Sequence, residues 1–127
     1  MTYIKHKSEE SMEDYLETIL LLHNKKNKVR SIDIVSELGY TKASVSVAMK
    51  GLREKGLITM DEDNYITLTK EGLVIAKKIL ERHTLLSDWL IRLGVSEETA
   101  KEDACRIEHD ISEETFKILK EHCLKVK

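Results

Sequence analysis

The chain contains no proline among its 127 residues, where average usage would give about six. It also has only five glycines, one phenylalanine and two cysteines. The lack of proline excludes Pro-rich linkers and collagen-like repeats, and the scarcity of turn and aromatic residues argues against a β-sandwich. Two cysteines are too few for a disulfide scaffold. We therefore expect a mainly α-helical protein with short connections.

Long apolar runs and a strong net charge are also missing. No segment approaches the roughly 18 apolar residues of a membrane helix, and the N-terminus has no apolar signal region. We therefore expect a cytoplasmic protein with no membrane partner. The net charge is −2, but positive charge is concentrated in residues 24–30 and 41–57. Such local basic segments, rather than the total charge, indicate nucleic-acid binding.

Two predicted helices are separated by a tight turn in the first half of the chain. Ser31 is suited to cap a short helix that ends at Leu38, where Gly39 can adopt the left-handed conformation. Thr41 is suited to cap the next helix, which extends to about Lys55 with a polar, basic outer face. Helix, tight turn and basic helix form the pattern of a helix-turn-helix.

The segments on either side of this motif complete a winged helix-turn-helix. A first helix is predicted from about Ser8 or Ser11 to about Asn24. Two apolar runs, 57–60 and 65–68, flank a polar turn and predict a β-hairpin, the wing. Helices are then expected over 70–93, over 96–110 and after residue 112. We predict a mainly α fold with a DNA-binding domain over 1–72 and a helical dimerisation and metal-binding domain over 73–127.

Residues that bind metals recur at helical spacing. Asp14 and Glu17 are three residues apart, and Cys105, Glu108 and His109 stand at i, i+3 and i+4, so each set lies on one helix face. Thiolate, carboxylate and imidazole groups together suit a first-row transition metal. An acidic pair alone is ordinarily a solvated helix face, so the hypothesis depends on the combination. The candidate metal ligands are Asp14, Glu17, His83, Cys105, Glu108 and His109.

Four segments, 11–19, 68–72, 82–86 and 103–109, resemble motifs of the diphtheria-toxin-repressor and manganese-transport-regulator family of metal-dependent bacterial repressors. The resemblance covers nearly the whole chain, in order and with suitable spacing. It implies a homodimer that binds double-stranded operator DNA when loaded with metal and that regulates metal-ion homeostasis genes. It implies neither an enzyme nor an organic substrate. We expect a short form of the family, without its SH3-like domain.

The six candidate ligands fall on ligand positions of this family, in a hybrid pattern. Asp14 matches the manganese branch, whereas Cys105 matches the iron branch. A thiolate favours Fe²⁺, Co²⁺ or Zn²⁺ over Mn²⁺. We expect Fe²⁺ or Mn²⁺ as the cofactor, with Zn²⁺, Co²⁺ or Ni²⁺ as substitutes. Ser87 and Lys101 stand where the iron branch has ligands of a second metal site, so the sequence does not support that site in its iron-branch form.

The resemblance also indicates the DNA-contacting and dimer-forming residues. Those expected to face base edges are Thr41, Lys42, Ala43, Ser44, Ser46 and Val47. Those expected to contact phosphates are Lys50, Arg53, Lys28 and Arg30, for which a solvated surface is the alternative. The apolar set expected at the dimer interface, or alternatively in the core of one chain, is Leu85, Leu86, Trp89, Leu90 and Leu93.

Two features of the predicted DNA-binding surface depart from expectation. Relatives carry a polar base-reading residue where this chain has Val47, so base specificity depends more on DNA shape or is weaker, although Val47 or Ala43 can touch a thymine methyl group. The wing tip, residues 61–63, is acidic and would be repelled by phosphate.

Three alternative functions are compatible with parts of the pattern. A winged-helix regulator could sense a non-metal ligand or a redox signal at Cys105, in which case Asp14 and Glu17 would not matter. A metalloenzyme would need an open coordination position, but no nucleophile pair or oxyanion-hole segment is evident. A metal buffer would not need a helix-turn-helix.

Overall fold

A computed structural model describes the backbone of residues 7–125 and the burial of the side chains of residues 11–123. It consists of two compact units, an N-terminal unit up to Lys77 and a C-terminal unit from Lys78 onward. The division falls within the long helix α4 (Lys70–Leu93), a little beyond the boundary after residue 72 that the sequence predicts. Each unit is described separately below.

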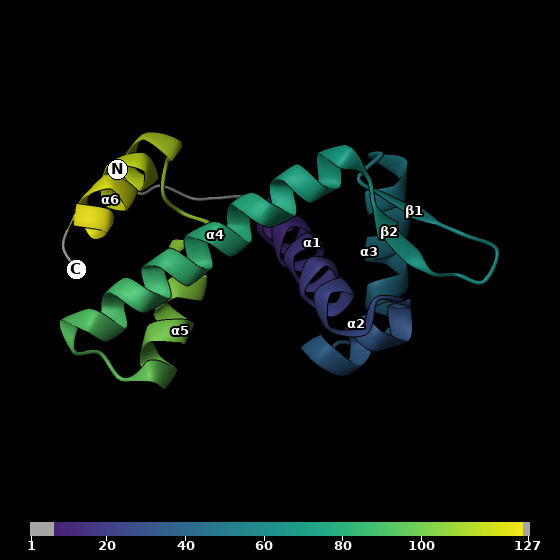
Figure 1. Cartoon of the computed structure of the whole chain (residues 1–127). Helices are drawn as coiled ribbons and strands as arrows, with labels where there is room; N and C mark the ends of the chain where they lie inside the picture. Colours follow the sequence, from purple (N-terminus) through teal and green to yellow (C-terminus); the bar gives the residue numbers. More distant parts are fainter. Residues whose placement is uncertain (1–6, 126–127) are drawn as a thin grey trace. The chain divides into compact units, whose positions relative to one another are not determined.

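The N-terminal unit contains the predicted winged helix-turn-helix (Figure 1). Its elements are α1 (Lys7–Lys26), α2 (Ser31–Leu38), α3 (Lys42–Glu54), β1 (Ile58–Met60) and β2 (Ile66–Leu68), followed by the first part of α4. Helix α3 packs against α2, α1 and β1, and α1 also packs against α2 and β2. The strands pair antiparallel, with Thr59 opposite Thr67. The predicted helix-turn-helix and hairpin are confirmed.

An apolar core joins all of these elements. The larger side chains with 2% exposure or less are Leu16 and Ile19 of α1, Val29, Ile34 of α2, Val45 and Met49 of α3, Ile58 of β1 and Ile66 of β2, and Ala76 of α4 is also fully buried. Burying each such side chain stabilises the fold by about 1.5–3 kcal/mol relative to leaving it exposed. Val45 and Met49 are four residues apart, so the inner face of α3 is apolar and its opposite face is available to solvent.

The predicted cap is confirmed at the start of α3 and is wrong at the start of α2. The Thr41 hydroxyl accepts a hydrogen bond from the Ser44 N–H at 3.1 Å, as predicted for a cap. The predicted Ser31 cap is wrong, because Arg30 is the N-cap and its N–H donates to the Asp33 carboxylate at 2.9 Å. Helix α1 begins at Lys7, close to the start at about Ser8 or Ser11 that the sequence predicts.

The junction between the wing and α4 requires glycine at position 72. The Thr69 N–H donates to the Leu57 carbonyl at 3.0 Å, and the Thr69 hydroxyl donates to the Gly56 carbonyl at 2.7 Å. The Gly72 N–H in turn donates to the Thr69 hydroxyl at 3.1 Å, which caps α4. A Cβ atom at position 72 would overlap the Leu57 carbonyl oxygen. This close approach explains the glycine in segment 68–72.

The C-terminal unit consists of the rest of α4 together with α5 (Glu97–Ile107) and α6 (Glu113–Lys125). The hydroxyls of Ser96 and Ser112 cap α5 and α6, next to the helix starts that the sequence predicts. Helix α5 ends at Ile107 rather than near Asp110, and residues 108–110 form a turn. Within residues 7–125, no helix combines the length and the apolar character needed to cross a membrane.

Candidate metal centre and nucleic-acid interface

The centre of the C-terminal unit is a buried carboxylate beside two imidazoles. Glu108 is 0% exposed and stands at the C-cap of α5. Its Oε2 atom is 2.8 Å from Nδ1 of His83 on α4, and its Oε1 atom is 3.3 Å from Nε2 of His109. His109 is also buried, at 3% exposure. Burying a carboxylate is costly unless charged or hydrogen-bonding groups compensate it, so this arrangement is a specific polar centre within the unit.

A buried arginine holds the segment that carries this carboxylate. Nη1 of Arg82, next to His83 in the sequence, donates to the backbone carbonyls of Glu108 and Ile111 at 3.0 and 2.9 Å. Its guanidinium lies 5.2 Å from the centre of the Phe116 ring. Arg82 is 5% exposed, and it satisfies carbonyls that the end of α5 would otherwise leave unpaired.

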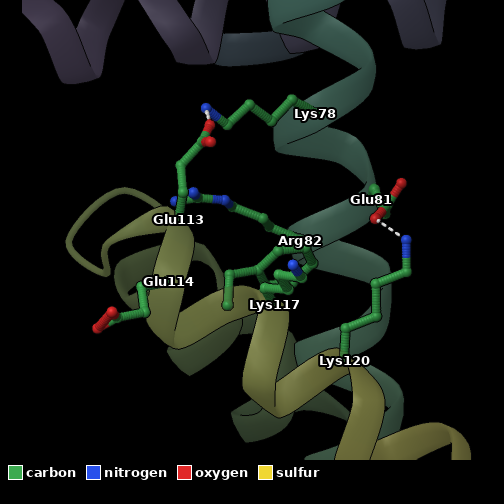
Figure 2. Close-up of a pocket in the computed structure, with 8 residues that line it drawn as sticks. Lys78, Glu81, Arg82, Glu113, Glu114, Lys117 and Lys120 are labelled. Atoms are coloured by element: carbon green, nitrogen blue, oxygen red, sulfur yellow. Dashed lines mark hydrogen bonds and ion pairs between the residues drawn. The ribbon is translucent and has the colours of Figure 1, made fainter.

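Two ion pairs between α4 and α6 flank Arg82 (Figure 2). Lys78 pairs with Glu113, and Lys120 pairs with Glu81 at 2.6 Å. Together with Arg82 these pairs attach α6 to α4. Sequence reasoning did not identify Arg82; its only signal was its position beside His83 in segment 82–86.

Cys105 stands one turn before Glu108 on α5. Its Sγ atom lies within 4.8 Å of a Glu108 carboxylate oxygen, and its side chain is exposed. The unit therefore gathers a thiol and two imidazoles around the Glu108 carboxylate. This donor set fits a divalent first-row ion, for which imidazole and thiolate are characteristic ligands.

The other two predicted ligands, Asp14 and Glu17, belong to the N-terminal unit. They lie three residues apart on α1, where Asp14 is half-buried and Glu17 is 9% exposed. They therefore do not form the fully solvated acidic face that such a pair ordinarily makes. Of the positions considered for a second metal site, Ser87 is buried and Lys101 pairs with Glu97 at 2.9 Å.

The outer face of α3 presents the predicted DNA-contacting residues. Every one of these is exposed: Thr41, Lys42, Ala43, Ser44, Ser46, Val47, Lys50 and Arg53. Two of them are also engaged locally, since the Thr41 hydroxyl donates to the Ser44 hydroxyl at 2.9 Å. The face carries three cations, and the single acid of the helix is Glu54 at its end. This charge distribution suits a polyanion.

The basic loop before α2 is attached to the wing. Val29 is fully buried and pairs with Ile66 of β2, whose N–H donates to the Val29 carbonyl at 2.7 Å. The flanking Lys28 and Arg30 project over the ring of Tyr65, with Nζ 5.0 Å and Cζ 4.3 Å from its centre. Tyr65 therefore positions the two predicted phosphate contacts by cation–π attraction, a role that sequence reasoning missed.

The acidic wing tip has a local structural cause. Oδ1 of Asp61 accepts hydrogen bonds from the N–H groups of Asp63 and Tyr65, both at 2.9 Å. Asn64 adopts a positive φ of 66°, which asparagine tolerates better than most residues. Asp61 is thus a turn-forming residue, whereas Glu62 and Asp63 remain exposed acids.

The apolar set predicted at a dimer interface is divided by exposure. Leu86 is 1% exposed and already belongs to the core of the C-terminal unit. Leu93 is 65% exposed, and Leu85, Trp89 and Leu90 are half-buried. The exposed parts of this set are therefore available to a second protein surface.

A winged helix-turn-helix in one unit and a thiol, carboxylate and imidazole centre in the other define a class of DNA-binding regulators that respond to metal. Comparison with known proteins agrees. Residues 7–65 match the domain described as "Iron dependent repressor, N-terminal DNA binding domain", and residues 69–127 match "Iron dependent repressor, metal binding and dimerisation domain". The chain belongs to this iron-dependent repressor family, which comprises metal-dependent transcriptional repressors.

Individual relatives include characterised and uncharacterised regulators. An uncharacterised HTH-type transcriptional regulator of Methanocaldococcus jannaschii is 35% identical over 113 residues, which cover 87% of this chain and 90% of that protein. The transcriptional regulator MntR of Escherichia coli is 38% identical over 107 residues, covering 84% and 69%. A solved structure of the manganese regulator SloR is 26% identical with a TM-score of 0.78. That match covers 87% of this chain and 52% of the other, so the chain spans about half the length of that structure.

Proposed function

We propose that this protein is a transcriptional repressor that binds operator DNA as a homodimer when Fe²⁺ or Mn²⁺ is bound, and that it controls genes of metal-ion homeostasis. The observation that carries the proposal is the Glu108 carboxylate, fully buried between the imidazoles of His83 and His109. As a repressor the protein acts on the chromosome in the cytoplasm and needs no catalytic activity or organic substrate.

In this proposal the metal is held by donors from both units. His83, Cys105, Glu108 and His109 are supported by their clustering in the C-terminal unit. Asp14 and Glu17 are supported by their match to the family motif in segment 11–19 and by their burial on α1. When bound, the ion supplies positive charge and Lewis acidity to this donor set. The negatively charged Glu108 carboxylate would neutralise part of that charge, and Arg82 holds the Glu108 backbone in place.

The metal is expected to be iron or manganese. The matched family domains are described as iron dependent, and the solved relative is described as a manganese regulator. In this chain the Cys105 thiolate favours Fe²⁺, Co²⁺ or Zn²⁺, whereas the carboxylates tolerate Mn²⁺. Ligands must be deprotonated to bind, so metal affinity should fall as the pH becomes acidic.

DNA binding in this proposal uses the outer face of α3 and the loop that contains Lys28 and Arg30. Helix α3 reads base edges, while the loop and Lys50 and Arg53 contact phosphates. A twofold dimer, with the exposed parts of Leu93, Trp89 and their neighbours at its interface, would read two half-sites about one DNA turn, or a multiple of it, apart. Because the ligands come from both units, metal occupancy and DNA binding are coupled equilibria.

The direct test is the DNA affinity of the full chain with and without metal. A random-sequence duplex library is selected anaerobically with Mn²⁺ or Fe²⁺, and the affinity for the enriched duplex is then measured with metal and with chelator. We expect metal to raise this affinity by more than about tenfold, within the usual range of coupling energies. An affinity that is equal in metal and in chelator would refute the proposal.

The same DNA-affinity measurement distinguishes the proposed function from the redox alternative. If Cys105 sensed oxidation instead of metal, metal would not change DNA binding, Asp14→Asn would bind DNA like the wild type, and thiol oxidation would abolish DNA binding. The proposal predicts that Asp14→Asn weakens the metal response.

A further inference from the structure

The most exposed large hydrophobic side chain among the described residues lies in the middle of the DNA-facing surface. Val47 of α3 is 73% exposed, more than Leu93 or Val74 elsewhere in the chain. It lies on the face opposite the buried Val45 and Met49. The side chain of Val47 therefore exposes apolar surface to water, which is unfavourable, and it does not contribute to the apolar core.

The surroundings of Val47 are suited to a groove lined by phosphates. Val47 lines a hollow together with Ser31, Ser46, Met49, Lys50, Arg53 and Met60. Lys50, one turn after Val47, and Arg53 supply positive charge to this hollow. The sequence of α3 contains neither asparagine nor glutamine, and the whole chain contains no glutamine. The amide side chains that pair bidentately with adenine are therefore missing from this helix.

We propose that Val47 is a specificity-determining residue that contacts the 5-methyl group of a thymine in the major groove of each operator half-site. This inference rests on the proposed function, since it requires that α3 enters the groove. Among the base-pair edges in the major groove, the thymine methyl is the apolar group that an apolar side chain can recognise. The flanking cations favour DNA, rather than an apolar protein surface, as the partner of Val47.

The test removes one methyl group at a time from the DNA. The duplex enriched from a random library by the Mn²⁺-loaded full chain is resynthesised with single thymines replaced by deoxyuridine, which lacks only the methyl group. Loss of one buried methyl, about 0.8 kcal/mol, corresponds to about a fourfold loss of affinity. We expect this loss at one thymine position of each half-site and less than twofold at the other thymines.

Substitutions then assign the effect to Val47. Val47→Ala should bind the thymine and deoxyuridine duplexes with affinities within about twofold, because the methyl contact is gone. Val74→Ala, a change of an exposed valine on α4, is the matched control and should keep the fourfold discrimination. Because both valines are exposed, neither variant should change the thermal unfolding temperature appreciably.

The outcomes distinguish this inference from the proposed function. If no sequence is enriched in a metal-dependent way, both are overturned. If a duplex is enriched but no deoxyuridine replacement weakens binding, only the inference is overturned. Equal thymine discrimination by the wild type and Val47→Ala would also overturn it, since another residue would then read the methyl. Loss of all DNA binding in Val47→Ala at normal stability would point to a different role for Val47 and would contradict the inference.

Discussion

The two units place their functional groups in opposite environments. In the N-terminal unit the DNA-facing residues lie on the surface of an apolar core, and its buried polar side chains, Glu17 and Thr18, are both on α1. In the C-terminal unit the centre of the candidate metal site is buried, because Arg82, Glu108 and His109 are all buried, although Cys105 is exposed. In the N-terminal unit, residues that contact DNA can therefore be changed without loss of stability. In the C-terminal unit, a change in the residues around the metal centre should affect both metal binding and stability.

This difference follows from what each unit binds. A DNA surface must remain accessible to a polyanion and needs no buried charge, so the core beneath it can be largely apolar. A metal ion needs converging donors, and buried donors must be kept in place by hydrogen bonds, as Arg82 does for the backbone of Glu108. Substitutions should consequently have different effects in the two units.

The largest effect on function is expected from the buried carboxylate. Glu108→Gln keeps the size of the side chain but removes its charge, so it should abolish the metal-dependent increase in operator affinity. Operator binding by the variant is titrated with and without Mn²⁺. Glu114→Gln, an exposed glutamate of α6 in the same unit, is the control and should respond like the wild type. An undiminished metal response in Glu108→Gln would contradict the comparison between the units.

The largest effect on stability is expected at Gly72. Gly72→Ala forces a Cβ against the Leu57 carbonyl, and such overpacking should destabilise the protein by about 3 kcal/mol. The matched control is Gly51→Ala in α3, where no atom lies near the added Cβ and alanine favours the helix by up to about 1 kcal/mol. Thermal and denaturant unfolding should therefore shift in opposite directions for the same chemical change. If the unfolding transitions of both variants shift in the same direction, the proposed clash of the added Cβ with the Leu57 carbonyl is contradicted.

Arg82 should link stability to the metal centre. Arg82→Met preserves much of the side-chain volume but leaves the Glu108 and Ile111 carbonyls without their donor, which costs about 1–3 kcal/mol for each buried group. Denaturant unfolding and metal affinity should both decline. Arg106→Met removes an exposed ion pair with Asp103 and should change either quantity little. A variant of Arg82 with normal stability and weakened metal binding would separate the two properties and break the comparison.

The smallest predicted effect concerns pH and lies in the N-terminal unit. Hydrogen bonds from Lys26 and from the backbone of Arg30 lower the pKa of the Asp33 carboxyl. A lowered pKa stabilises the fold above the unfolded value of about 4, and this contribution is lost as the pH falls through the lower folded value. Asp33→Asn should cost about 0.5–1 kcal/mol at neutral pH, and the difference from the wild type should shrink below about pH 4.

Unfolding measured at several pH values checks this prediction, with the exposed Glu37→Gln of the same helix as the control. A difference between Asp33→Asn and the wild type that is constant from neutral to acidic pH would show that the Asp33 charge is not what stabilises α2.

Helical spacing and capping residues were enough to predict the elements of both units. Thr41, Ser96 and Ser112 cap the helices that the sequence assigns to them, because their hydroxyls act within one turn. The predicted Ser31 cap of α2 is wrong because the Asp33 carboxylate, within the first turn, accepts the hydrogen bond from the Arg30 N–H at the start of the helix. Local sequence signals were therefore reliable where a single side chain determines a helix end.

Contacts between distant segments were not predictable in the same way. Tyr65 positions Lys28 and Arg30, and Arg82 supports Glu108, across separations that no periodicity reveals. Gly72 was noticed in a motif, but its reason, the Leu57 carbonyl, appears only in the fold. The candidate ligands were recognisable because their residue types and the family motifs coincide.

The central claim is that metal binding and DNA binding are coupled, and the most direct measurement is metal affinity with and without the selected operator duplex. The affinity of the wild-type chain for Mn²⁺ is measured in both conditions under anaerobic, chelator-free solution. Linkage predicts that saturating DNA tightens metal binding by the same factor by which metal tightens DNA binding. A metal affinity that does not change when operator DNA is added would contradict the account.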